Sequence, residues 1–271
     1  MTLWEAVVLG LVQGLTEFLP ISSSGHLVLG KYLLGIDPAG AANVTFEIFV
    51  HFGTVLSILT VYRSRVWEIT RVTLSALARP SSVTERFRTE EAFRIGLYIL
   101  VTMIPTAAAY VLFGDFFEAA FGDPRLVCAM LVVTGVLLLL TMLRRNPSGE
   151  LTAFKSLLIG VAQAAAMIPG ISRSGSTICT ALYQNVQPEK AANFSFLMLL
   201  PVVLGATLLK SFDVAASEAA IGWAPILVGT VVAYASGVLA IRLLLGVIRK
   251  GHLQWFALYC FAAAAAGLIF I

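Results

Sequence analysis

The stretch QGLTEFLPISSSGH, residues 13–26, interrupts an apolar segment that extends from residue 2 to residue 35. Pro20 stops a helix, and the serines that follow it favour the start of a new one. The pieces on either side contain roughly 14 to 17 residues, or about 21–25 Å of helix, which is marginal for crossing a bilayer. We therefore predict that residues 2–35 form a helical hairpin that enters the membrane and returns to the same side.

A second apolar segment, residues 153–187, is broken in the same way by PGISRSGST, residues 169–177. Aligning Gln13 with Gln163 also superimposes an Ile, two Ser and a Gly at the two breaks. An odd number of crossings in each half would give the halves inverted topology. The match predicts two repeats, each with one hairpin and three membrane-spanning helices: residues 1–146 and 147–271.

The composition excludes an ordinary soluble protein. Hydrophobic residues make up 59% of the 271 residues and charged residues only 12%, against about 25% charged residues in soluble domains. We predict an all-α polytopic membrane protein in a single domain, with inverted-topology repeats, six full transmembrane helices and two re-entrant helix hairpins. The six expected spans are 44–62, 92–113, 125–143, 191–210, 223–247 and 254–271.

Basic residues gather in alternate connections between these spans, whereas the connections near 114–124 and 211–222 are acidic. The positive-inside rule places the basic connections in the cytoplasm and therefore both termini outside. The first hairpin would then open to the outer face and the second to the inner face. The expected loop 63–94 alone holds seven arginines: Arg63, Arg65, Arg71, Arg79, Arg86, Arg88 and Arg94.

Ionisable side chains sit at the two hairpin tips, where each costs about 2.5–3.5 kcal/mol to insert into a membrane. That cost indicates a function for Glu17, His26 and Arg173. Helix N-termini at serine-rich tips attract anions, and the guanidinium fork of Arg173 suits phosphate oxygens. Glu17 can bind a divalent cation or act as a base, and His26 can carry a proton. Together they predict phosphoryl-transfer chemistry.

Simpler interpretations stay open at several positions. Ser22, Ser23 and Ser24 could serve only as helix caps, and Arg173 could pair with Glu17 as a structural bridge. His51 is expected to be an interior residue with its hydrogen bonds satisfied, and His252 to be solvated. The cysteines lack the spacing of a metal or disulfide framework and are expected to be buried packing thiols: Cys128, Cys179 and Cys260.

The two tips resemble the undecaprenyl-diphosphate phosphatase (bacitracin-resistance) family, which shows [E/Q]xxxE, PxSS(S/T)GH and a distant PGxSRSxxT. The resemblance covers essentially the whole chain, with these motifs at residues 13–17, 20–26 and 169–177 and a family-like FSFLMLLP at 194–201. It implies hydrolysis of undecaprenyl diphosphate to the monophosphate and inorganic phosphate at the outer face of the bacterial plasma membrane. That reaction recycles the lipid carrier for peptidoglycan synthesis and confers bacitracin resistance.

The resemblance also implies roles for individual residues. A divalent cation, Mg²⁺ or Ca²⁺, is expected at Glu17, although Gln13 stands where a second carboxylate would complete a simple metal site. Expected partners are the C55 diphosphate lipid and membrane lipids, with a homodimer allowed and no nucleic acid. Catalytic roles fall on Glu17, Ser23, His26 and Arg173. Diphosphate binding falls on Gln13, Ser22, Ser24, Ser172, Ser174 and Thr177.

Two other functions are weighed against this one. Type-2 phosphatidate phosphatases share SGH and SR elements but need a histidine soon after SR, and the next histidine here is the distant His252. A transporter that moves the lipid monophosphate would also suit inverted repeats with re-entrant tips. The nucleophile, either Ser23 or a water activated by Glu17, stays open.

Overall fold

A computed structural model describes residues 1–35, 41–77, 83–144, 147–215 and 222–271, and the regular structure in these ranges is helical. Arg79 and the expected repeat boundary at residue 146 lie outside the described residues. The helices are α1 (Leu3–Phe18), α2 (Ser23–Leu34), α3 (Ala41–Val61), α4 (Arg63–Leu77), α5 (Val83–Thr89), α6 (Glu91–Ala120), α7 (Pro124–Leu140), η2 (Thr141–Leu143), α8 (Ala153–Ala165), α9 (Arg173–Tyr183), α10 (Pro188–Ala215), α11 (Trp223–Arg249) and α12 (Gln254–Phe270).

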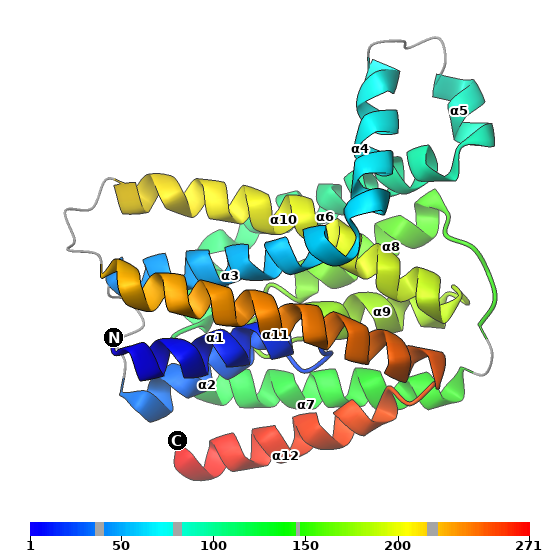
Figure 1. The fold of residues 1–271 in the computed structure, drawn as a ribbon. Coiled ribbons are helices and arrows are strands. Elements are labelled where there is room, and N and C mark those ends of the chain that lie inside the picture. The colour runs from blue at the N-terminus through cyan, green and yellow to red at the C-terminus, as the bar shows by residue number, and fades with distance from the viewer. Residues whose placement is uncertain (36–40, 78–82, 145–146, 216–221) are drawn as a thin grey trace.

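Five helices in the described part of the chain are long and apolar enough to cross a membrane: α3, α6, α7, α10 and α11. They coincide with five of the six expected spans, so the protein is a multi-pass membrane protein. The sixth expected span is α12, an apolar helix of 17 residues, or about 25 Å at 1.5 Å per residue. The long helices run side by side along one axis (Figure 1).

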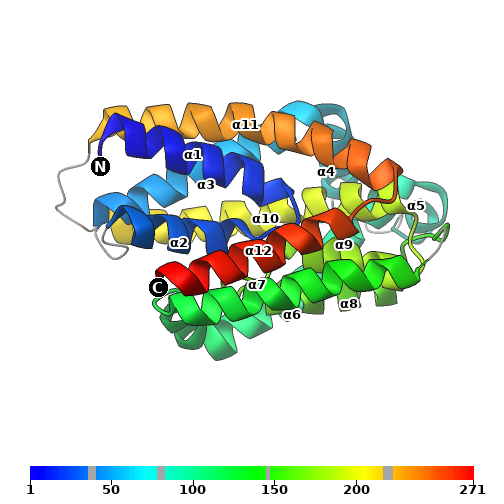
Figure 2. The ribbon, with the colours of Figure 1, turned by 90° about the horizontal axis from the view of Figure 1, so that it is seen from below.

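The two broken segments form the two helix pairs that their prolines predict. Helices α1 and α2 pack together at the end of the bundle that holds both termini, and α8 and α9 pack together at the other end (Figures 1 and 2). The two turns meet in the middle. The Ser174 hydroxyl donates a hydrogen bond to the carbonyl oxygen of Leu19 at 3.2 Å. The two tips therefore touch, as a single site formed by residues of both tips requires.

Two connections are more helical than expected. The arginine-rich segment 63–94, expected as a loop, is folded into α4, α5 and the start of α6, and α4 and α5 project from the end opposite the termini (Figure 1). Likewise, α6 continues to Ala120 instead of ending at the expected residue 113. The helix kinks at Phe113, because this residue has non-helical dihedral angles (φ −132°, ψ 20°).

Small residues set how closely the hairpin tips approach. A Cβ atom on Gly25 would lie 3.1 Å from the Cα of Gly170, so the two turns pack backbone against backbone. Gly170 itself has a φ of +97°, and a Cβ there would lie 2.7 Å from the Cβ of Met130 on α7. The second turn therefore needs glycine for both its conformation and its packing.

Replacing Gly170 by alanine should lower the free energy of unfolding by about 2 kcal/mol or more, since it combines a strained φ with overpacking. Gly246→Ala is the matched control, because a Cβ at Gly246 in α11 meets no atom within 4 Å. That change should be neutral or raise stability by about 0.5–1 kcal/mol. Thermal unfolding in detergent measures both, and equal stability of the two variants would contradict the assigned packing.

Candidate active site

Glu17 lies in the last turn of α1, with its side chain only 1% exposed, and three donors surround its carboxylate. Gln13, one turn earlier on the same face, donates from Nε2 to Oε2 at 2.9 Å. Ser23, the first residue of α2, donates its hydroxyl to the same Oε2 at 2.5 Å. A carboxylate bonded this closely to a hydroxyl has the geometry of a general base beside a nucleophile.

The third donor comes from the other helix pair. Arg173 is the first residue of α9, and its Nη2 donates to Oε1 of Glu17 in an ion pair. The guanidinium is therefore held in place by the carboxylate. Its other terminal nitrogen, Nη1, is buried, and no described residue accepts a hydrogen bond from it. A buried charged donor without a partner is costly and marks a place where an anionic acceptor would bind.

The serine-rich turns cap their helices with the same pattern of hydrogen bonds. Ser22 Oγ accepts a hydrogen bond from the backbone N–H of Gly25 at 3.2 Å, and Ser172 Oγ accepts one from Gly175 at 3.1 Å. In each turn the capping serine also lies 3.3 Å from the serine two positions later. Ser22 and Ser172 therefore cap α2 and α9, while their part in binding diphosphate stays a prediction. Both helix N-termini point their dipoles toward the centre of the bundle.

Thr177 makes no hydrogen bond to the carboxylate within the described residues. Its hydroxyl donates to the backbone carbonyl oxygen of Arg173 at 2.7 Å and lies 2.6 Å from the hydroxyl of Ser195 on α10. This contact ties α9 to α10 beside the cavity at the ion pair, which Ser195 lines. A direct role for Thr177 in binding diphosphate stays a prediction.

His26 lies one turn after Ser23 on the same face of α2. Its Nδ1 donates to the carbonyl oxygen of Ser22 at 2.7 Å. Ser22 has a φ of 70°, which is a strained conformation for a residue with a side chain. Within the described residues, the hydrogen bonds of the ring go to Ser22 and to Tyr259 of α12, and none joins it to Glu17 or Arg173.

Little space is left at the ion pair. The cavity between Glu17 and Arg173 has a volume of about 10 Å³, which is at the lower limit for a single water molecule. Phe196 and Leu199 of α10 close it on the side of the bundle core. The site in this structure is therefore assembled, with room for about one water molecule beside the ion pair.

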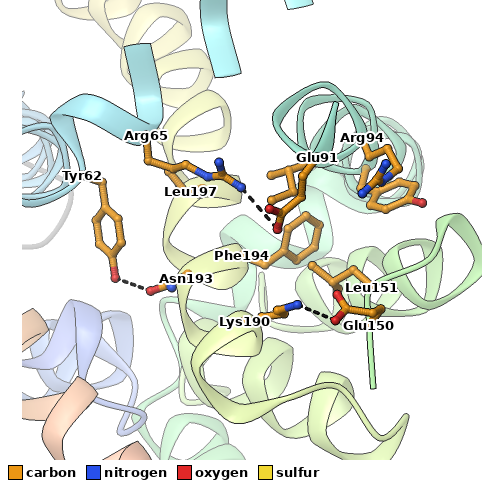
Figure 3. Close-up of a pocket in the computed structure, with 12 residues that line it drawn as sticks. Tyr62, Arg65, Glu91, Arg94, Glu150, Leu151, Lys190, Asn193, Phe194 and Leu197 are labelled. Atoms are coloured by element: carbon orange, nitrogen blue, oxygen red, sulfur yellow. Dashed lines mark hydrogen bonds and ion pairs between the residues drawn. The ribbon is translucent and has the colours of Figure 1, made fainter. Parts of the chain in front are cut away.

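A larger cavity of about 340 Å³ lies at the arginine-rich end of the bundle (Figure 3). Two of its cations are already paired with carboxylates, Arg65 with Glu91 and Lys190 with Glu150, and Arg94 donates to backbone carbonyl oxygens. Burial raises the pKa of the Tyr62 phenol, so it stays protonated and donates to Asn193 Oδ1 at 2.8 Å. The crevice holds none of the residues at the hairpin tips and is separate from the candidate site.

The sequence pattern of the family described as "Bacitracin resistance protein BacA" matches residues 6–266. The chain belongs to this family. It is 58% identical over 268 residues to the undecaprenyl-diphosphatase of Salinibacter ruber, covering 99% of both chains. It is 41% identical over 264 residues to that of Halothermothrix orenii, covering 96% of this chain and 95% of the relative. It is also 38% identical over 273 residues to that of Christiangramia forsetii, covering 100% of this chain and 98% of the relative.

The expected resemblance to this family is thus confirmed, and the structure of this BacA-family chain joins Gln13, Glu17, Ser23 and Arg173 directly. The sequence analysis did not predict two residues that contact its site residues: Ser195, which contacts Thr177, and Tyr259, which contacts His26. Ser195 lies within the family-like FSFLMLLP segment, a signal that the prediction did not use. Tyr259 lies in an ordinary apolar helix, and nothing in the sequence pairs it with His26.

Removing either partner of the buried pair, with Glu17→Gln or Arg173→Gln, should lower the free energy of unfolding by about 3–5 kcal/mol, because it leaves an unpaired buried charge. The double variant should recover more than half of the summed loss. The pair Glu189–Arg249 is the control, since both side chains are about half exposed or more and their removal should cost about 1 kcal/mol or less. Additive losses at Glu17 and Arg173, measured by thermal unfolding, would contradict the coupling.

Proposed function

We propose that this protein is an undecaprenyl-diphosphatase, an enzyme that releases inorganic phosphate from undecaprenyl diphosphate and regenerates the lipid monophosphate carrier for peptidoglycan synthesis. Bacitracin resistance would follow from that activity. The full-length relatives named for this activity support the assignment. The single structural observation that carries it is Nη1 of Arg173, which is buried and has no acceptor among the described residues. The other terminal nitrogen of this guanidinium bonds to the same carboxylate that accepts the hydroxyl of Ser23.

In the proposed reaction, Ser23 attacks the terminal phosphorus of the diphosphate. Its proton passes to Oε2 of Glu17, which the hydroxyl already contacts at 2.5 Å. A bond forms between Ser23 Oγ and phosphorus, and the bond from phosphorus to the bridging oxygen breaks, so that undecaprenyl phosphate leaves. Glu17 releases the first proton to solvent, and water then cleaves the phosphoserine with the regenerated carboxylate as its base, which restores the Ser23 hydroxyl and releases inorganic phosphate.

The charges on the phosphate are matched by groups at both tips. Arg173 would bind a phosphate oxygen through Nη1 while Nη2 stays on Glu17, which is the bidentate use that a guanidinium allows. Ser24 and Ser174, together with the helix N-termini, would position the remaining oxygens. Once Nε2 has taken up a proton from solvent, His26 would exchange its present partner there for the departing oxygen and donate that proton to it.

A divalent cation fits this site in part. The amide oxygen of Gln13 is buried beside Glu17, and none of the described residues donates a hydrogen bond to it. Oxygen ligands are those that Mg²⁺ and Ca²⁺ prefer. No cluster of three or more His, Cys, Asp or Glu side chains occurs in the described ranges, so most ligands would have to come from the substrate and water. When bound by Glu17 and Gln13, the cation would neutralise charge on the diphosphate.

The placement in the membrane belongs to the same proposal. The α1–α2 and α8–α9 pairs would be re-entrant hairpins of two inverted repeats, with α12 as the sixth span. The short lengths of these helices, 11 to 16 residues, and the meeting of their turns in the middle of the bundle support this. Arginine counting supports a plasma-membrane orientation with both termini outside and the site open to the outer face.

The test is release of inorganic phosphate from a polyprenyl diphosphate by the purified protein in detergent. Glu17→Ala and Arg173→Ala should lower kcat/KM by about 10²- to 10⁴-fold, and His26→Ala by about tenfold or more. Arg249→Gln, which removes an exposed arginine at the end of the bundle opposite the termini, should leave the rate unchanged. Near-normal turnover in all three site variants would end the proposal, and a protein that only transports lipid would release no phosphate.

Ser23→Ala separates the two candidate nucleophiles in the same assay. Loss of turnover, with an acid-stable phosphoserine trapped in the wild type, would support Ser23. Substantial turnover of Ser23→Ala would assign the attack to a water molecule bound at Glu17.

Chelation with EDTA should abolish phosphate release, and Mg²⁺ or Ca²⁺ should restore it. Gln13→Glu should lower the metal concentration needed for half-maximal activity, since it supplies a second carboxylate beside Glu17. Gln163→Glu, at the corresponding position of the other helix pair, is the control and should not change the metal requirement. Full activity in EDTA would exclude the cation.

A further inference from the structure

Tyr259 of α12 contacts His26 in two ways. Its hydroxyl lies 2.8 Å from Nε2 of the imidazole. The two rings also stack, with their centroids 5.5 Å apart and their planes at 16°. A hydrogen bond leaves a ring free to tilt and a stacking contact leaves it free to slide, so the two contacts together fix the plane of the imidazole.

The partner of the other ring nitrogen decides the direction of this hydrogen bond. The carbonyl oxygen of Ser22 only accepts, so Nδ1 carries the proton. In the neutral ring, Nε2 then holds a lone pair, and Tyr259 donates its hydroxyl to that lone pair. The strained backbone of Ser22 and the hydroxyl of Tyr259 therefore hold the imidazole in one tautomer, from opposite sides.

The surroundings of Tyr259 place its ring at the edge of the site. Its side chain is 45% exposed, so burial in the core does not account for its position. The next residue, Cys260, is fully buried, and its thiol lies 3.9 Å from the carbonyl oxygen of Pro20 in the first turn. Helix α12 is thereby anchored on the hairpin tip, one residue away from the contact with His26.

We propose that Tyr259 is a positioning residue for the reaction, which acts by holding Nε2 of His26 ready for a substrate oxygen. This inference rests on the proposed phosphatase function. The phenol is a neutral partner, and a hydrogen bond to a charged phosphate oxygen is about twice as strong as a neutral one. A phosphate oxygen only accepts, so the exchange occurs once Nε2 has taken up a proton from solvent. The charged imidazolium then donates to the phosphate in place of its contact with the hydroxyl, while the stacked ring keeps the imidazole in place.

Tyr259→Phe tests the hydroxyl and keeps the stacking, whereas Tyr259→Leu removes both contacts. We expect kcat to fall about tenfold in Tyr259→Phe, the order expected for one lost hydrogen bond, and further in Tyr259→Leu, with KM within about twofold of wild type. Tyr234→Phe is the control, since it removes a hydroxyl that lies 3.2 Å from Thr60 Oγ1 on other helices, and it should be normal. An unchanged kcat in Tyr259→Phe, whether or not KM changes, would overturn the proposal.

A second measurement does not depend on turnover. The chain has three histidines, so ¹⁵N-histidine labelling gives a simple NMR spectrum, in which His26→Gln identifies the signals of His26. Nε2 of His26 should shift in Tyr259→Phe and stay unchanged in Tyr234→Phe. An unchanged Nε2 signal in Tyr259→Phe would refute the contact. If the wild type releases no phosphate, the proposed function fails, and this spectrum still decides whether Tyr259 holds His26.

Discussion

The ion pair between Glu17 and Arg173 is the interaction on which the architecture depends. It joins residues 156 positions apart and lies where the two helix pairs meet. A charge at this depth without its partner costs several kcal/mol, so neither tip is stable in this position alone. The pair therefore makes the meeting of the tips a condition of folding, and it leaves one nitrogen of the guanidinium free for an anion.

The two turns share the same capping hydrogen bonds but differ in backbone conformation at the capping serine and carry different chemistry. In each one a serine caps the following helix and a glycine allows close approach. The first residue of the following helix differs, since it is Ser23 in one turn and Arg173 in the other. Both side chains reach the same carboxylate, so the two similar turns bring a candidate nucleophile and a cation together at Glu17.

The small cavity at the pair has a consequence for substrate binding. A space of about 10 Å³ is at the lower limit for one water molecule, so it cannot hold a diphosphate group. Binding must therefore move Phe196 and its neighbours on α10 or separate the tips. Pro201 lies within α10, five residues beyond Phe196, and it removes a backbone hydrogen bond at a point where that helix can bend.

Sequence alone determined the elements of this protein and the chemistry of its site. Long apolar stretches identified five spans, the prolines at residues 20 and 169 marked the two breaks, and the insertion cost of Glu17, His26 and Arg173 indicated a function. Helix formation in 63–94 was missed, because arginine-rich polar sequence is typical of both loops and surface helices.

Only the tertiary structure decided which groups meet. It placed Ser23 rather than His26 on the carboxylate, turned Thr177 toward Ser195, and brought Tyr259 onto the imidazole. Such contacts depend on how helices far apart in sequence pack and rotate. Local propensity and hydropathy fix where a helix begins and ends, but they do not fix which residue of a distant helix its side chains will meet.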